Sequence, residues 1–185
     1  MINKILTKIK KEYRLRSLDA GVFQKLVIEG ANFEINSFEL VGAGRVATMC
    51  ASRLFGMVKR DTLIISPMEK DAAVITYERL KAFRKDSILI ARYDMKNEAE
   101  YIKKEGKKKQ SEEFDQEVER IFENYLQELR SAVPCEQMGR KAEIEKLVTL
   151  FIEESKLSSD IFFANYGMEI TEKLYHQVMF GTREN

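Results

Sequence analysis

Between Asp61 and Met95, short apolar runs alternate with short polar connections. The runs are rich in β-branched residues, and no helical spacing of apolar positions separates them. Connections this short join antiparallel neighbours, because parallel strands need a long crossover. Two similar runs come before Asp61, and the first of them starts by alternating apolar and polar residues. The predicted strands are 33–40, 45–54, 61–67, 72–77 and 87–94.

Apolar residues recur at helical spacing on both sides of this region. The stretch 96–110 is nearly all charged, which predicts a surface loop or a frayed helix. Strands and helices segregated in this way indicate an α+β fold, which we expect to be a three-layer α/β/α sandwich around a mainly antiparallel sheet. The predicted helices are 2–15, 18–28, one from Ser111 to before Pro134, 141–154, a short one from Asp160, and 170–179.

The same patterns predict the core. Of the 185 residues, 44% are apolar, so the chain can bury a sizeable core, and its length fits a single domain spanning 1–185. Apolar positions on the inward faces of the strands and helices should fill that core. The residues predicted to be buried are Leu63, Ile65, Val74, Ile88, Ile90, Phe122, Leu126, Leu147 and Leu174.

The charges nearly balance, with a formal net charge of +1. Because binding a polyanion normally needs a clear basic excess, we expect neither a nucleic-acid nor a membrane partner. The sequence has no secretory signal and no long apolar run, which favours a cytoplasmic protein. Cys50 and Cys135 form no C-x-x-C pair, and we expect them to be small core residues rather than a disulfide.

The Gly42–Ala47 segment reads G-A-G-R-V-A, which matches the G-x-G-x-x-A pattern of dinucleotide-binding folds. That motif needs a buried parallel strand before it and a helix after it, so that the helix N-terminus holds a pyrophosphate. The preceding strand carries Glu34 and Asn36, which is typical of a half-exposed antiparallel strand. A glycine-rich hairpin turn is therefore favoured, and a nucleotide-binding enzyme using the Gly42–Ala47 loop is the weaker alternative.

His176 is the only histidine, so a catalytic triad or a histidine metal ligand would have to use it. It lies between Leu174 and Val178 on the last predicted helix, off the apolar stripe, and we expect it to be exposed or at an edge. No residue near it has the spacing of a metal ligand. The acidic residues of 112–119 spread around a helix rather than converging, and no metal site is predicted.

Several polar residues lie on or beside the apolar strands of the predicted sheet. Such a sheet face can form a flat pocket for a large planar ligand. Glu78 directly follows the run Ala72–Tyr77, and a buried carboxyl group there would have a raised pKa and could donate a proton. An ordinary carboxylate at a strand end is the alternative. The other polar residues of this group are Thr62, Ser66, Tyr77, Arg92 and Tyr93.

The segment Thr62-Leu-Ile-Ile-Ser-Pro67, followed by Asp71-Ala-Ala-Val-Ile-Thr-Tyr-Glu78, resembles the central strands of two related families. These are the ferredoxin-dependent bilin reductases and the red chlorophyll catabolite reductases. In them an apolar strand ends at a proline, and the next apolar strand closes on an aspartate that protonates the tetrapyrrole. The resemblance implies an α/β/α sandwich with substrate between the sheet and the C-terminal helices, and it places Glu78 at the position of that aspartate.

The resemblance implies a protein that binds a bilin- or haem-like tetrapyrrole, or another flat acid. If the family's chemistry is retained, the protein reduces a linear tetrapyrrole with electrons from a ferredoxin or flavodoxin, and no bound cofactor is expected. Glu78 replaces the aspartate, and Thr62 and Ser66 stand on the strand where bilin reductases can place a histidine, so enzymatic activity stays open. A non-catalytic binding or assembly protein on the same fold is the alternative. The predicted ligand-binding residues are Thr62, Ser66, Tyr77, Arg45, Arg53 and Arg92, with the arginines pairing with propionates.

Overall fold

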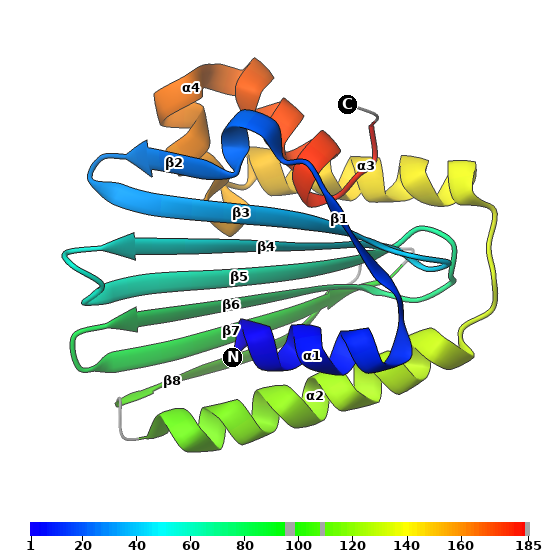
Figure 1. Ribbon diagram of the computed structural model, residues 1–185, viewed down its shortest axis with the longest axis horizontal. Coiled ribbons are helices and arrows are strands. Elements are labelled where there is room, and N and C mark those ends of the chain that lie inside the picture. The colour runs from blue at the N-terminus through cyan, green and yellow to red at the C-terminus, as the bar shows by residue number, and fades with distance from the viewer. Residues whose placement is uncertain (95–98, 108–109, 184–185) are drawn as a thin grey trace.

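The computed structural model describes residues 1–94, 99–107 and 110–183. Within them, the chain forms an eight-stranded sheet and four α-helices (Figure 1). All strand pairings are antiparallel, and β3 to β8 follow one another across the sheet in chain order. The predicted α+β class and the antiparallel sheet are therefore confirmed. None of the helices that the structure describes is long and apolar enough to cross a membrane.

The five predicted strands are all present, and several are longer than predicted. The main extension is in β6, which continues past Tyr77 into a tight turn at Phe83 and Arg84 before β7 begins. Pro67 ends β5 as predicted, because a proline cannot donate to the next ladder position. The strands are β1 (Leu15–Leu18), β2 (Lys25–Ile28), β3 (Ala31–Leu40), β4 (Gly44–Arg53), β5 (Val58–Pro67), β6 (Val74–Ala82), β7 (Lys85–Tyr93) and β8 (Ala99–Lys107).

The helix predicted over 18–28 is wrong. That segment instead holds the end of β1, a short 3-10 turn and β2, and both strands pair with β3. Gly30 does not end a helix but sits in the two-residue turn between Ile28 and Ala31, with φ of 75°. A two-residue hairpin favours glycine at such a position. The helical spacing of apolar residues here is accidental, and the sheet edge determines the structure.

The loop or frayed helix predicted over 96–110 is also wrong for 99–107, which forms β8 and pairs along its length with β7. The rest of that prediction, 96–98 and 108–110, lies mostly outside the described residues. Charged side chains are normal on such a strand, because they discourage pairing with further chains. Two of its lysines are paired, Lys103 with Glu105 at 3.1 Å and Lys104 with Glu117 of α2.

The Gly42–Ala47 segment forms the predicted hairpin turn. It joins β3 to β4, and Gly44 begins a strand rather than a helix. Gly44 is required by close packing, since a Cβ there would lie 2.1 Å from the carbonyl oxygen of Ser66. The strand–loop–helix context of a nucleotide site is absent from this segment, so the nucleotide interpretation loses its basis.

The first and the third predicted helices follow their apolar stripes closely. In the helix that starts at Ser111, Phe114, Val118, Phe122 and Tyr125 are buried at spacings of four, four and three residues. Two acidic residues lie in its first turn, where they match the helix dipole. The helices are α1 (Ile2–Glu12), α2 (Ser111–Ser131), α3 (Gln137–Glu153) and α4 (Ser159–Lys173), and a π-helical turn, Leu174–Met179, follows α4.

Side chains from the sheet enter two hydrophobic clusters. In β5, Leu63 and Ile65 belong to a cluster with α1 and α2, whereas Ile64 belongs to a cluster with α3, α4 and the π-helical turn. Neighbouring strand residues point to opposite sides of a sheet, so the two clusters use opposite faces. We call these the α2 face and the C-terminal face. All nine residues predicted to be buried lie in one of the two clusters.

Candidate functional site

Glu78 lies in the middle of β6 rather than after its end. Its cross-strand neighbours are Thr62 on β5 and Leu89 on β7. Two residues back, Thr76 is opposite Ile64, which packs with the C-terminal helices. Because residues two apart in a strand share a face, Glu78 and Thr62 both lie on the C-terminal face.

The carboxyl group of Glu78 is partly buried, and it forms no hydrogen bond or ion pair with any residue that the structure describes. Burial raises the pKa of Glu78, and the nearby charge of Arg60 lowers it only in part. Directly opposite, Thr62 is fully buried, and its hydroxyl lacks a hydrogen-bond partner among the described atoms. Buried polar groups without partners are rare and mark sites of function or of bound water.

Residues from the C-terminal helices cover one side of this pair. Arg60, on β5 beside Thr62, donates a hydrogen bond from Nη1 to Ser158 Oγ at 2.6 Å. The hydroxyl of Tyr175 donates to the carbonyl oxygen of Leu157. Leu157 and Ser158 both have positive φ, of 55° and 66°, which costs about 1–3 kcal/mol for a residue other than glycine. The turn of Leu157 and Ser158, which Arg60 contacts beside the pair, is therefore strained.

Two further predicted ligand residues, Ser66 and Arg45, share this face at the other end of the strands. They are cross-strand partners on β5 and β4. Ser66 is fully buried, and its hydroxyl has no partner in the described part of the chain. Arg45 donates from Nη1 to Ser37 Oγ at 3.0 Å, and Ser37 in turn donates to the carbonyl oxygen of Val178 at 2.7 Å. Burial lowers the pKa of Arg45.

Tyr77 and Arg92 lie on the opposite, α2 face, away from Glu78. The Tyr77 ring packs edge-on against Phe122 of α2, with ring centroids 6.2 Å apart. Arg92 pairs with Glu128 of α2 through Nη2 at 2.6 Å. The structure thus separates these two residues from the other predicted ligand residues.

Arg53 lies apart from both groups, at the end of β4. It lines an open cavity of about 1100 Å³ between the ends of β2, β3, β4 and β5. The charges around the cavity are mixed, since Lys25 and Lys59 contribute to it together with Glu34 and Asp61. Neither Glu78 nor Thr62 lines this cavity.

Comparisons with known proteins find similarity in structure but not in sequence. The sequence matches no protein-family model and no curated protein. In structure, however, the chain is similar to phytochromobilin synthase from tomato, solved in complex with biliverdin, with a TM-score of 0.78. The similarity covers 98% of this chain and 82% of the tomato chain, at 8% sequence identity. The chain has the fold of a ferredoxin-dependent bilin reductase.

The resemblance to the bilin reductases is therefore confirmed at the level of the fold. At 8% identity, the similarity to the bilin reductase concerns the fold alone. The roles assigned to Glu78 and to the six ligand residues remain predictions. Arg60 was not predicted at all. It lies two residues before Thr62 in the same strand, and this spacing of two was the available signal that it shares the face of Glu78.

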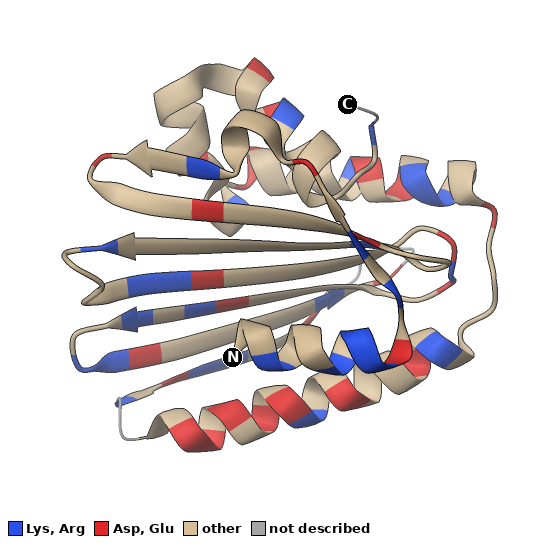
Figure 2. Cartoon of the chain, in the orientation of Figure 1, with Lys and Arg blue, Asp and Glu red and all other residues tan. Residues whose placement is uncertain are grey.

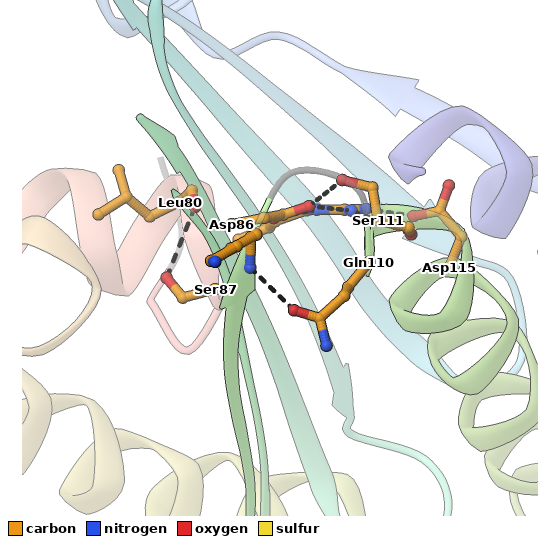
Figure 3. Close-up of polar contacts among 8 residues, drawn as sticks. Leu80, Asp86, Ser87, Gln110, Ser111 and Asp115 are labelled. Atoms are coloured by element: carbon orange, nitrogen blue, oxygen red, sulfur yellow. Dashed lines mark hydrogen bonds and ion pairs between the residues drawn. The ribbon is translucent and has the colours of Figure 1, made fainter. Parts of the chain in front are cut away.

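A buried ion cluster on the α2 face was also missed (Figure 3). Arg79 donates to both carboxylate oxygens of Asp86, from Nε at 2.8 Å and from Nη2 at 2.6 Å. It also pairs with Asp115 of α2, and Ser111 donates its hydroxyl to Asp86. Both Arg79 and Asp86 are almost fully buried. Because the charges have partners within the cluster, we assign it a structural role that joins the β6–β7 hairpin to α2.

The prediction that His176 is exposed or at an edge is wrong, because its side chain is 1% exposed. It lies in the π-helical turn, and its Nδ1 is 3.0 Å from the hydroxyl oxygen of Thr182. The chain folds back at this point, since the backbone N–H of Thr182 donates to the carbonyl oxygen of His176 at 2.8 Å. Burial lowers the pKa of His176, and the charge of Arg183 lowers it further.

We expect stability to fall on mild acidification because of His176. A histidine with a lowered pKa in the folded state takes up its proton first in the unfolded chain, so its contribution is complete above about pH 6.5 and declines below it. His176 is the only histidine, so the effect can be assigned to it. The unfolding midpoint of the wild type should drop between about pH 6.5 and 5, and that of His176→Gln should drop less. Equal slopes in the two proteins would show that another group causes the loss.

The remaining candidates for a reactive site are the two cysteines and possible metal ligands. Cys50 and Cys135 are free, as predicted, and partly buried, and Cys50 packs against the hydrophobic cluster of the α2 face. Burial raises the pKa of Cys50 to about 12, which makes it a poor nucleophile. Over the described ranges, no three His, Cys, Asp or Glu side chains are grouped closely enough to hold a metal ion. The pair of Thr62 and Glu78 is therefore the main candidate site.

Proposed function

We propose that this protein binds a linear tetrapyrrole between the C-terminal face of its sheet and the C-terminal helices. On this proposal the layers form the three-layer α/β/α sandwich of the bilin reductases. One observation carries the proposal: Glu78 is a partly buried carboxyl group without a partner among the described residues, opposite the equally unpartnered hydroxyl of Thr62, in a chain with this fold.

Each polar group of the site has a role in this proposal. With its raised pKa, Glu78 holds its proton to a higher pH than an exposed glutamate and donates it to the tetrapyrrole. Thr62 gives its unused hydroxyl hydrogen bond to a pyrrole or lactam group of the ligand. Arg60 and Arg45 lie on the same face and pair with the propionates.

The strained turn of Leu157 and Ser158 is the part that moves in this proposal. A ligand as large as a tetrapyrrole needs room that Leu157 and Ser158 now occupy beside Arg60. Since both residues have left-handed backbone conformations, releasing the turn recovers strain that offsets part of the lost packing. Binding would exchange the hydrogen bond from Arg60 to Ser158 for one from Arg60 to a propionate.

Reduction of the bound tetrapyrrole is the finer part of the proposal. The protein would take electrons from a ferredoxin or flavodoxin, and Glu78 would supply a proton. A glutamate in place of the family's aspartate moves the acid by about one bond length, and a displacement of that order can cost about 100-fold in rate. Binding should therefore be easier to detect than turnover. A binding module without catalysis is the second candidate, and this same substitution favours it.

The test is a spectroscopic titration with biliverdin. We expect the wild type to shift the visible absorption of biliverdin at micromolar protein. Glu78→Gln should bind with similar affinity, because the amide keeps the shape of the carboxyl group, but with a ferredoxin system its turnover should be about 100- to 10,000-fold slower, because it cannot donate a proton.

Two matched controls separate the site from the rest of the molecule. Glu100→Gln changes an exposed glutamate on β8 and should affect neither binding nor turnover. Tyr77→Phe removes a hydroxyl from the α2 face and should also leave binding unchanged. Binding without turnover in both the wild type and Glu78→Gln would leave the binding module. An unchanged biliverdin spectrum with the wild type would refute the proposal.

A further inference from the structure

Two neighbouring hairpin turns expose large apolar side chains at one end of the sheet. The β4–β5 turn carries Leu54, Phe55 and Met57, and the β6–β7 turn carries Phe83. Phe55 is fully exposed, and Phe83 is 65% exposed. The turns are side by side, because the backbone N–H of Phe83 donates to the carbonyl oxygen of Met57 at 3.4 Å. We call these two turns, with the charged residues that flank them, the hairpin-tip surface.

The backbone at these turns is unfavourable for the residues it holds. Leu54, Phe55 and Phe83 have φ values of 53°, 54° and 52°. Bulky residues rarely adopt this left-handed conformation, which glycine and asparagine tolerate at much lower cost. The apolar side chains are thus neither buried nor favoured by the turns that present them. A functional role outside the folded monomer accounts for both features.

Basic residues surround the apolar turns (Figure 2). Lys59 and Lys81 are directly opposite each other on β5 and β6, and like charges in this position repel. Asp86 lies directly opposite Lys81 on β7 and offsets part of this repulsion. None of the five basic residues of this surface forms a salt bridge within the described ranges. Of the nearby acidic groups, Asp86 is buried in the ion cluster, and Asp61 and Glu29 line the open cavity together with Arg53 and Lys59. The five basic residues are Arg53, Lys59, Lys81, Arg84 and Lys85.

We propose that the hairpin-tip surface docks the protein onto an anionic phospholipid bilayer. Phe55, Phe83 and Leu54 insert at the level of the headgroups, and the surrounding lysines and arginines contact lipid phosphates. The net charge of +1 predicted no membrane partner. Attraction to a bilayer, however, depends on where the cations cluster on the surface and not on the net charge of the whole chain. This docking does not depend on tetrapyrrole binding.

The shape of the surface favours a bilayer over an acidic protein. Phe55 and Phe83 project from the ends of two hairpins and are largely exposed, and Leu54 and Phe55 also line the open cavity beside Arg53. A protein partner would need matching pockets for them, since protein interfaces are close-packed at their centres. A bilayer interface is deformable and accepts protruding aromatic side chains together with a ring of cations.

The experiment is co-sedimentation of the full chain with vesicles of phosphatidylcholine, with and without phosphatidylserine. We expect binding to the vesicles that contain phosphatidylserine, weak or no binding to pure phosphatidylcholine, and release by high salt. The double variant Phe55→Ser, Phe83→Ser should lose at least tenfold in affinity. The double variant Lys81→Gln, Arg84→Gln should lose about fivefold for each cation removed.

The matched control is Phe163→Ser with Tyr166→Ser, two exposed aromatic residues on α4, outside this surface. It should bind like the wild type, and thermal unfolding should be similar for all variants because every changed side chain is on the surface. Failure to sediment with anionic vesicles would overturn the proposal. So would binding that does not depend on Phe55 and Phe83. Capture by soluble polyglutamate but not by vesicles would point instead to an acidic protein.

Discussion

Replacing Asp86 with alanine is expected to lower the free energy of unfolding by about 3–5 kcal/mol. Asp86 is buried and accepts hydrogen bonds from Arg79 and from Ser111. Without this carboxylate, the buried guanidinium of Arg79 keeps only the partly exposed Asp115 as an anionic partner. Removing one member of a buried ion pair costs more than the pair contributes, because the other charge stays buried and poorly compensated.

Urea unfolding of the wild type and of Asp86→Ala measures this loss. Asp71→Ala is the matched control, since Asp71 is exposed and its side chain has no role in the buried cluster. The control should lie within about 0.5 kcal/mol of the wild type. If the two variants lose equally little stability, the buried cluster is not the link between the β6–β7 hairpin and α2.

The pH dependence of Asp86→Ala gives a second check. Burial alone would raise the pKa of Asp86, but its hydrogen bonds from Arg79 and Ser111 outweigh burial, and the pKa lies below its ordinary value. Such a group stabilises the fold fully above its unfolded pKa of about 3.9, and that contribution is lost as the pH falls through the lower, folded pKa. The stability difference between the wild type and Asp86→Ala should therefore shrink on strong acidification.

The sequence predicts this fold best where the hydrophobic pattern is unambiguous. The central strands and α2 combine long apolar patterns with clear end signals such as Pro67 and the acidic first turn of α2. At the edges of the sheet the prediction from sequence fails, and the reason is physical. The strands β1 and β2 have only four residues each, too few for alternation to outweigh a chance helical spacing, and β8 is so charged that it carries little hydrophobic pattern. Pairing with β3 determines the structure of β1 and β2, and pairing with β7 determines that of β8.

The candidate site was predicted only in part. Glu78 and Thr62 do lie opposite each other, but their pairing depends on the β5–β6 register, which local sequence does not specify. The separation of Tyr77 from Glu78 follows directly from alternation, since adjacent residues of one strand face opposite sides. Glu78 was predicted to follow the end of this strand, but β6 continues past it to Ala82, so the alternation applies to Glu78 as well. The contact from Arg60 to Ser158 joins residues far apart in the chain, and no local pattern contains it.

Replacing Phe122 with alanine is expected to cost about 3–5 kcal/mol of stability. Phe122 is fully buried on α2, and its ring packs edge-on against Tyr77 at a centroid distance of 6.2 Å and an interplanar angle of 86°. The substitution removes the ring and leaves a cavity between α2 and the sheet, which packed neighbours fill only in part.

The matched control for this prediction is Phe55→Ala, which removes the same atoms from a fully exposed position. Its unfolding free energy should stay within about 0.5 kcal/mol of that of the wild type, because exposed side chains contribute little to the folded state. Chemical denaturation of both variants gives the comparison. Since Phe122 and Tyr77 lie on the face opposite Glu78, any biliverdin binding should survive in Phe122→Ala under conditions where that variant is folded. A loss of binding in the folded variant would place the ligand on the α2 face instead.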